Sequence, residues 1–108
     1  PGNLSPGLKK RTQMARSNVV MPSIVFYDDP EYGLDAMQTH LIRESIVQMH
    51  KEGGRTSVVA TGSPSWAVGV AGRMAVLNQG RLEAVGTYEE LTSHPSQHVR
   101  DFLKVKPV

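Results

Sequence analysis

The stretch Ile24-Val25-Phe26-Tyr27-Asp28-Asp29-Pro30 decides the fold class of this chain. Four apolar residues followed by two carboxylates and a proline are typical of a buried strand that ends at a charged tip. Pro30 favours an end of the strand here, because proline has no N–H to donate to the ladder. Carboxylates at the carboxyl end of a parallel strand lie where ligands bind in open α/β sheets. The alternative is a strand followed by an acidic turn without chemistry.

Helical and strand patterns alternate along the rest of the chain. We expect helices over 5–19, 34–53, 63–71 and 87–94, a last helical turn over 97–104, and strands over 24–27, 56–60, 73–77 and 82–85. Ser5-Pro6 and Ser63-Pro64 are typical helix starts, Gly53-Gly54 is a helix end, and Thr87 with Glu90 is a capping box. Strand–helix alternation predicts an α/β fold with a mostly parallel sheet and flanking helices. Its parallel strands would be the first three, and 82–85 would form a hairpin with the third.

Composition excludes several classes of function. The net charge is only +2, and Lys9-Lys10-Arg11 is one short run that we interpret as a solvated helix face, so nucleic acid is not an expected partner. Without cysteine there is no disulfide framework and no thiolate metal site. The four histidines show no ligand spacing. No stretch approaches the ~20 apolar residues of a spanning helix, and no signal peptide is recognisable. Because the chain starts at Pro1, we expect a fragment, a processed product or a partial gene.

The motifs around the acidic strand end resemble the ATP-binding subunit of ABC transporters. Leu4-Ser5-Pro6-Gly7-Leu8 is similar to the family's signature motif, Asp28-Asp29 falls on the Walker B aspartate and the catalytic glutamate, and Leu34-Asp35 matches the D-loop without a gap. The hairpin pattern around Gln79-Gly80 and the following Gly86-Thr87 match the end of the same domain. The resemblance therefore implies that residues 1–108 are the C-terminal half of the nucleotide-binding domain, a partial P-loop NTPase-like fold.

The resemblance also assigns roles to individual residues. It implies nucleotide binding for Ser5, Gly7 and Asp35, a water-mediated Mg²⁺ contact for Asp28, and the position of the catalytic base for Asp29. The complete family domain uses ATP and Mg²⁺. The 108 residues contain no Gly-x-x-x-x-Gly-Lys-Ser/Thr loop, whose N–H groups and lysine supply the main phosphate-binding energy. We therefore expect no cofactor on this chain alone.

The chain departs from the family pattern at three functional sites, which are the signature motif, the position of the catalytic base and the position of the switch histidine. Pro6 removes one N–H from the signature motif, which Leu8 also makes more apolar. Asp29 is one methylene shorter than the family's glutamate, and a misplacement of ~1 Å can reduce a rate roughly a hundredfold. Gly62 stands after Thr61 where the family has its switch histidine. These departures predict a site released from catalysis and an inactive isolated chain.

Two hypotheses of different classes follow. In the first, the chain is part of a transporter ATPase that works with a membrane permease subunit and lies in the cytoplasm at the inner membrane face. The run Leu8–Arg11 with Ala15-Arg16-Ser17, and the ending His94–Leu103, resemble the phospholipid-trafficking branch with MCE-domain partners. In the second, the chain is a non-catalytic α/β interaction module that binds itself or a partner. A small α/β domain with chance motif matches is the third interpretation.

Both main hypotheses predict association with another chain. The strands 24–27 and 58–60 are nearly continuous apolar runs, and parallel strands are normally covered on both faces and paired on both sides. We expect a homo-oligomer or a partner that completes the sheet.

Overall fold

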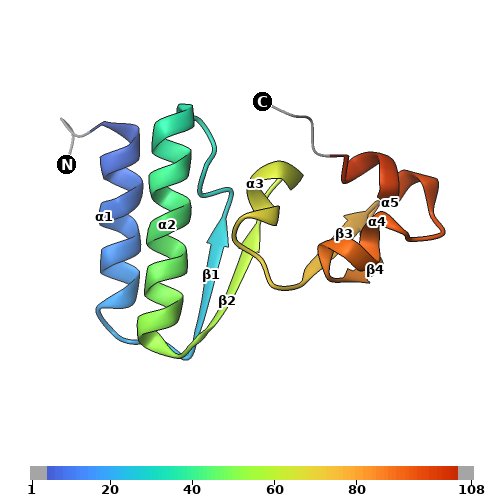
Figure 1. Cartoon of the computed structure of the whole chain (residues 1–108). Coiled ribbons are helices and arrows are strands. Elements are labelled where there is room, and N and C mark those ends of the chain that lie inside the picture. Colours follow the sequence, from blue (N-terminus) through green and yellow to red (C-terminus); the bar gives the residue numbers. More distant parts are fainter. Residues whose placement is uncertain (1–4, 105–108) are drawn as a thin grey trace. The chain divides into compact units, whose positions relative to one another are not determined.

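The computed structural model describes residues 5–104, which divide into two compact units with a boundary between Gly62 and Ser63. The first unit contains α1 (Pro6–Asn18), β1 (Ile24–Asp28), α2 (Ala36–Gly53) and β2 (Thr56–Ala60). The second contains α3 (Pro64–Val68), β3 (Met74–Asn78), β4 (Arg81–Gly86), α4 (Tyr88–Thr92) and α5 (Gln97–Phe102) (Figure 1). The element order agrees with the alternation that the sequence predicts.

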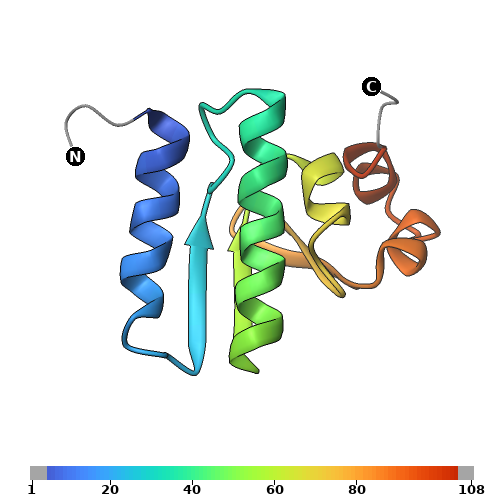
Figure 2. The same cartoon turned by 60° about the vertical axis from the view of Figure 1, so that its left-hand side comes forward.

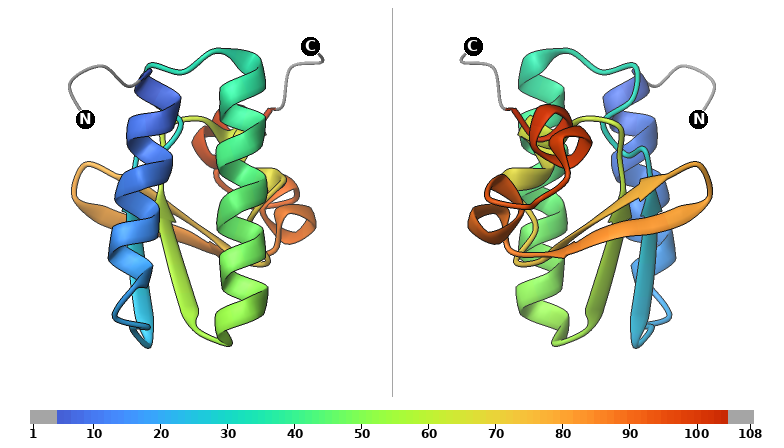
Figure 3. Two further views of the ribbon diagram at one scale, coloured as in Figure 1. Left: turned by 90° about the vertical axis from the view of Figure 1, so that its left-hand side faces the viewer. Right: turned by 90° about the vertical axis from the view of Figure 1, so that its right-hand side faces the viewer.

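The first unit is a βαβ arrangement with an additional helix. β1 and β2 pair in parallel, with Phe26 opposite Val58 and Asp28 opposite Ala60, and they lie side by side in Figure 2. Both helices cover the same face of this pair of strands (Figure 3). Val25 and Tyr27 are the buried residues of β1, and alternation along the strand places them on one face. The interior of this unit is completed by buried residues of the helices, which are Met14, Ile42 and Ile46.

The opposite face of the β1–β2 pair is apolar and exposed. Ile24 is 53%, Phe26 75% and Val58 45% exposed. We call these three residues the open sheet face. Parallel sheets are normally covered on both faces, so exposed apolar residues on one face of the β1–β2 pair are unusual for the fold class.

Local signals set the helix ends. The Ser5 hydroxyl accepts the Leu8 N–H, Gly54 ends α2 in the left-handed conformation with φ 57°, and Thr87 with Glu90 forms the expected capping box. These three predictions are confirmed. The prediction for Ser63 is wrong in its detail: it occupies the N-cap position of α3, but its side chain makes no capping hydrogen bond.

The second unit is built on an antiparallel hairpin. β3 and β4 pair with each other through a two-residue turn in which Gln79 and Gly80 both have positive φ, 50° and 76°. Such turns match the twist of the flanking strands and favour pairing between sequence neighbours. The buried core of this unit joins both strands to α4 and α5 through Val76, Ala84, Leu91, Val99 and Leu103.

The predicted mostly parallel sheet is therefore not confirmed. Among residues 5–104 the strands form two separate two-stranded sheets, only one of which is parallel. The predicted hairpin of the third strand with 82–85 is confirmed, because β3 pairs antiparallel with β4 across the tight Gln79-Gly80 turn. The parallel pairing that was also predicted for the third strand is not found among these residues. Within this same part of the chain, no helix combines the length and the apolar character needed to cross a membrane.

Candidate functional site

The two consecutive aspartates lie at the carboxyl end of β1. Asp28 is the last residue of the strand. Asp29 turns the chain with a φ of 44°, donates its N–H to the Ala60 carbonyl at 2.8 Å and accepts the Tyr32 N–H on its carbonyl at 3.1 Å. Pro30 follows and is buried. The sequence prediction of a strand that ends at a charged tip is confirmed, with the strand one residue longer than expected.

The carboxylates of this turn are accessible. Asp28 and Asp29 are both exposed, and within residues 5–104 neither carboxylate has a hydrogen-bond or ion-pair partner. Carboxylate oxygens suit Mg²⁺, which keeps several waters and binds through one or two carboxylates together with phosphate oxygens. The described residues hold no cluster of three or more potential metal ligands. This donor set therefore fits a hydrated Mg²⁺ shared with a phosphate, and it does not form a protein cage of its own.

Three side chains that sequence reasoning did not select surround the acidic turn. The Lys10 ammonium donates to the Asp29 carbonyl at 2.9 Å from α1. The Thr61 hydroxyl, directly after β2, donates to Glu31 Oε1. No periodicity or motif identifies Lys10 or Glu31, since each contact joins residues 19 or 30 positions apart.

The start of α1 has little spare hydrogen-bonding capacity. Pro6 has no N–H, the Leu8 N–H donates to the Ser5 hydroxyl at 3.2 Å, and the Lys9 N–H donates to the Ser5 carbonyl at 2.9 Å. Helix N-termini bind anions through free N–H groups of this first turn. Because Ser5 and Pro6 occupy or remove most of them, few N–H groups remain at this helix end for an anion.

The starts of α1 and α2 lie close together. Asp35 is the N-cap of α2, where its carboxylate accepts the Gln38 N–H at 2.8 Å and the Gln38 side chain returns to the Asp35 N–H at 3.4 Å. A Cβ added at buried Gly7 would lie 3.0 Å from Gln38 Nε2. Gly7 thus permits a close approach, and Gln38 brings two predicted nucleotide-binding residues, Gly7 and Asp35, into one region. The capping role of Asp35 was not part of the sequence prediction.

Gly62 leaves open space after β2. A Cβ at this position would meet no atom within 4 Å, and its backbone is not in the left-handed region. Glycine is therefore not required here by geometry. The position has room for a side chain, and Gly62 makes none of the contacts that a longer residue would make there.

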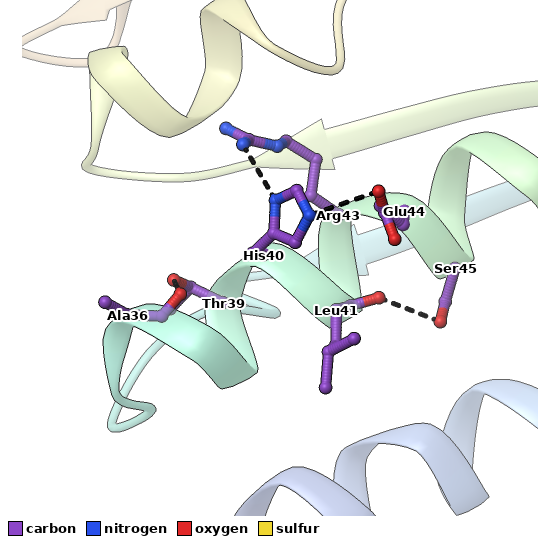
Figure 4. Close-up of polar contacts among 7 residues, drawn as sticks. All are labelled: Ala36, Thr39, His40, Leu41, Arg43, Glu44 and Ser45. Carbon is purple, nitrogen blue, oxygen red and sulfur yellow. Dashed lines mark hydrogen bonds and ion pairs between the residues drawn. The ribbon is translucent and has the colours of Figure 1, made fainter.

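The histidines are engaged in local contacts. On α2, His40 Nε2 lies 3.1 Å from Glu44 Oε1, and its Nδ1 lies 3.3 Å from the Arg43 guanidinium (Figure 4). His50 Nδ1 contacts the Ser57 hydroxyl at 3.1 Å, and His94 Nδ1 accepts the Ser96 N–H at 3.1 Å. His98 Nε2 lies 3.9 Å from Glu83 Oε2.

Curated proteins similar to this chain are named as import ATP-binding proteins. Over 104 residues, or 95% of the chain, it is 36% identical to the sn-glycerol-3-phosphate import ATP-binding protein UgpC 1 of Rhizobium johnstonii. Over the same length it is 39% identical to the sulfate/thiosulfate import ATP-binding protein CysA of Bacillus cereus and 34% identical to the Fe(3+) ions import ATP-binding protein FbpC 2 of Rhizobium meliloti. No protein-family model matches the chain.

The similarity covers only part of each relative. The matched segment is 28%, 29% and 26% of the length of these three proteins. The chain therefore spans less than a third of the proteins that it matches. Within that share, nearly all of its own residues are aligned.

Proposed function

We propose that this chain, homologous over nearly its whole length to a segment of ABC transporter ATP-binding subunits, is a degenerate form of that segment, covering the C-terminal half of the nucleotide-binding domain. The match over 95% of the chain carries the proposal. The Asp28 and Asp29 carboxylates at the end of β1, which have no partner among the described residues, support it. The acidic turn and the start of α1 would be its contribution to an ATP site that other residues complete.

The roles of the residues follow from their positions. ATP and Mg²⁺ in the complete domain would supply the phosphoryl group and the charge that neutralises it. Asp28 would hold the Mg²⁺ through water, and Asp29 would stand where a base orients the attacking water. Ser5, Gly7 and Asp35 would face nucleotide from the two helix starts. The residues of this chain would contact ATP and Mg²⁺ only in part, because no phosphate loop occurs among them.

The departures at Pro6, Asp29 and Gly62 lie at functional positions, and they support loss of turnover. Pro6 and the Ser5 cap leave few N–H groups for a phosphate. A shorter carboxylate at Asp29 changes the distance to the reacting water, and Gly62 offers no side chain in a space that has room for one. The isolated chain then binds no ATP and hydrolyses none.

The partners and the location come from the same proposal. As part of a transporter ATPase, the chain would contact a membrane permease subunit in the cytoplasm at the inner membrane face. The relatives' names refer to sn-glycerol-3-phosphate, sulfate or thiosulfate, and Fe(3+), and none of them refers to lipid. Membership of the phospholipid-trafficking branch stays a prediction that rests on the runs Leu8–Arg11 and His94–Leu103.

The open sheet face supports a second candidate function. Ile24, Phe26 and Val58 offer apolar surface on strands that have free edges among the described residues. Exposed apolar faces and strand edges favour association with another chain. A non-catalytic interaction module that assembles with itself or with a partner would use this face and would need none of the acidic residues.

Isothermal titration with Mg-ATP tests the proposal. We expect no heat of binding with the chain alone. A chimera in which this chain replaces the homologous segment of the Bacillus cereus protein should bind Mg-ATP, because the remainder of that protein supplies the residues missing here. Micromolar affinity of the isolated chain would contradict the assignment of the site. A folded chimera without affinity for Mg-ATP would favour the interaction module.

A further inference from the structure

We infer that Lys10 and the Glu31–Thr61 pair are positioning residues that hold the Asp28–Asp29 turn in the conformation needed to present its carboxylates. This inference rests on the proposed function of that turn and deepens it. The residues come from three places in the first unit, which are α1, the loop after β1 and the position directly after β2. The signature motif, the Walker B motif and the D-loop do not include Lys10, Glu31 or Thr61.

The backbone at Asp29 needs such support. A non-glycine residue in the left-handed region is disfavoured by roughly 1 kcal/mol or more, although Asp tolerates it better than most residues. Asp29 has a φ of 44° and is followed by proline. Strained backbone persists only where surrounding contacts determine it. The Asp29 N–H bond to Ala60 fixes one side of this peptide, and its carbonyl receives donors from Tyr32 and Lys10.

Lys10 ties the turn to the helix that begins at Ser5. Its ammonium reaches the Asp29 carbonyl at 2.9 Å from a position little more than one helical turn into α1. The bond is charge-assisted, and such bonds are stronger than neutral ones. Because the contact is to a main-chain oxygen, the cation leaves the Asp29 carboxylate free. The two parts of the candidate site, the helix start and the acidic turn, are thus joined by a single side chain.

The Glu31–Thr61 pair ties the same turn to β2. The Thr61 hydroxyl donates to Glu31 Oε1, while Glu31 Oε2 is buried and has no hydrogen-bond partner among the described residues. A buried carboxylate oxygen without a donor is unfavourable for stability. Because of this cost, we attribute to Glu31 a role in the geometry of the turn and not a contribution to the stability of the fold. The pair closes the gap between the loops after β1 and β2, directly beside the missing side chain of Gly62.

Amide hydrogen exchange on the whole chain, followed by NMR, tests the inference. Lys10→Met removes the donor at similar length, Glu31→Ala removes the acceptor, and Thr61→Val removes the hydroxyl at similar volume. Each should speed exchange of the Asp29 N–H by about tenfold while the protected amides within β1 change less than about twofold, because only the turn opens. The double variant Glu31→Ala with Thr61→Val should exceed neither single variant.

Conservative variants supply the readout that a merely structural role would not give. Lys10→Arg, Glu31→Gln and Thr61→Ser keep a donor or acceptor at each place and should leave Asp29 exchange near that of the parent. Exchange that rises equally at Asp29 and throughout β1 would overturn the inference, since the residues would then serve overall stability. Unchanged exchange at Asp29 would overturn it as well. The experiment contains no nucleotide, so its result is separate from the Mg-ATP titrations that test the proposed function.

Discussion

Ser5 is the N-cap of α1 and also belongs to the segment that resembles the signature motif. Its hydroxyl caps α1 by accepting the Leu8 N–H at 3.2 Å, and Pro6 occupies the first turn of the helix. Ser5→Ala should lower the free energy of unfolding by about 1 kcal/mol, as loss of an N-cap usually does. Urea denaturation followed by circular dichroism measures the change. Ser17→Ala is the matched control, because the Ser17 hydroxyl donates to the Gln13 carbonyl and caps no helix start. An equal loss of unfolding free energy in both variants would contradict the capping role of Ser5.

The substitution Pro6→Gly distinguishes an unstrained start of α1 from a strained one. Proline restricts the unfolded chain, so Pro6→Gly should destabilise the protein slightly if the native turn accommodates proline without strain. The same urea denaturation measures this effect. A stabilising Pro6→Gly substitution would show that proline strains the turn, and would favour a recently decayed signature motif.

The Asp101 carboxyl makes the stability of the folded chain depend on pH. The Gln97 side-chain amide donates to Asp101 Oδ1 at 2.7 Å, and this bond, followed by the contact with Lys104, lowers the pKa of the Asp101 carboxyl below its ordinary value of 3.8. A lowered pKa in the folded state means that the contribution to stability is present above the ordinary pKa and is lost as the pH falls through the folded value. The side chain is exposed, so the effect on stability is small.

An NMR titration of the Asp101 carboxyl carbon measures that pKa. We expect a midpoint below 3.8 in the parent chain and a higher midpoint in Gln97→Ala. Gln48→Ala removes a similar amide–carboxylate bond, from Gln48 to Glu52 on α2, and should leave Asp101 unchanged. A midpoint at or above the ordinary value in the parent would contradict the assigned contacts.

At the scale of elements, the end of α2 depends on one glycine conformation. Gly54 has a φ of 57° and a ψ of 30°, and a Cβ there would meet no atom within 4 Å. Gly54→Ala should therefore destabilise the protein by about 1 kcal/mol through the backbone alone. Gly62→Ala is the control, because that position is equally open but lacks a positive φ. Thermal unfolding that lowers the midpoint of both variants equally would show that the left-handed conformation is not the cause.

Elements were predictable where local chemistry determines them. The apolar run before Asp28, the caps at Ser5 and Thr87, and the Gly53-Gly54 end follow from neighbouring residues, and the structure has each of them. The hairpin of β3 with β4 was predicted from the Gln79-Gly80 turn and is confirmed, but the parallel neighbour predicted for β3 is not found among residues 5–104. The apolar pattern of β3 suits a parallel or an antiparallel neighbour, and the choice depends on which strands are available to it.

The candidate site was also predictable only where neighbouring residues determine it. Asp28 and Asp29 follow from a strand that ends in carboxylates, whereas the contacts of Lys10 with Asp29 and of Thr61 with Glu31 join distant parts of the first unit. A single sequence contains no periodicity that marks such pairs. The capping role of Asp35 had a local signal, because Gln38 three residues later completes a capping box.

At the scale of the whole molecule, the open sheet face predicts association. Ile24, Phe26 and Val58 are exposed apolar residues on one face of β1 and β2. We expect a dimer or a larger assembly at micromolar concentration, because burial of such a face gains roughly 25 cal/mol for each Å² of apolar surface removed from water. Light scattering measures the mass.

Substitution identifies the surface involved. Phe26→Ser should shift the distribution toward the monomer, whereas Tyr32→Ser, which changes an exposed aromatic residue outside that face, should not. A parent chain that is a monomer with a cooperative thermal transition would contradict the prediction.

Turnover of ATP by the chimera measures whether this chain, as we propose, is an ABC transporter ATP-binding segment whose site no longer catalyses. A chimera with the Bacillus cereus protein should bind Mg-ATP and hydrolyse it at less than about a hundredth of that protein's rate. Asp29→Glu with Gly62→His in the chimera should recover much of the rate, while the same pair of substitutions in the isolated chain should recover none. A chimera that turns over ATP at the parental rate without these substitutions would contradict the account.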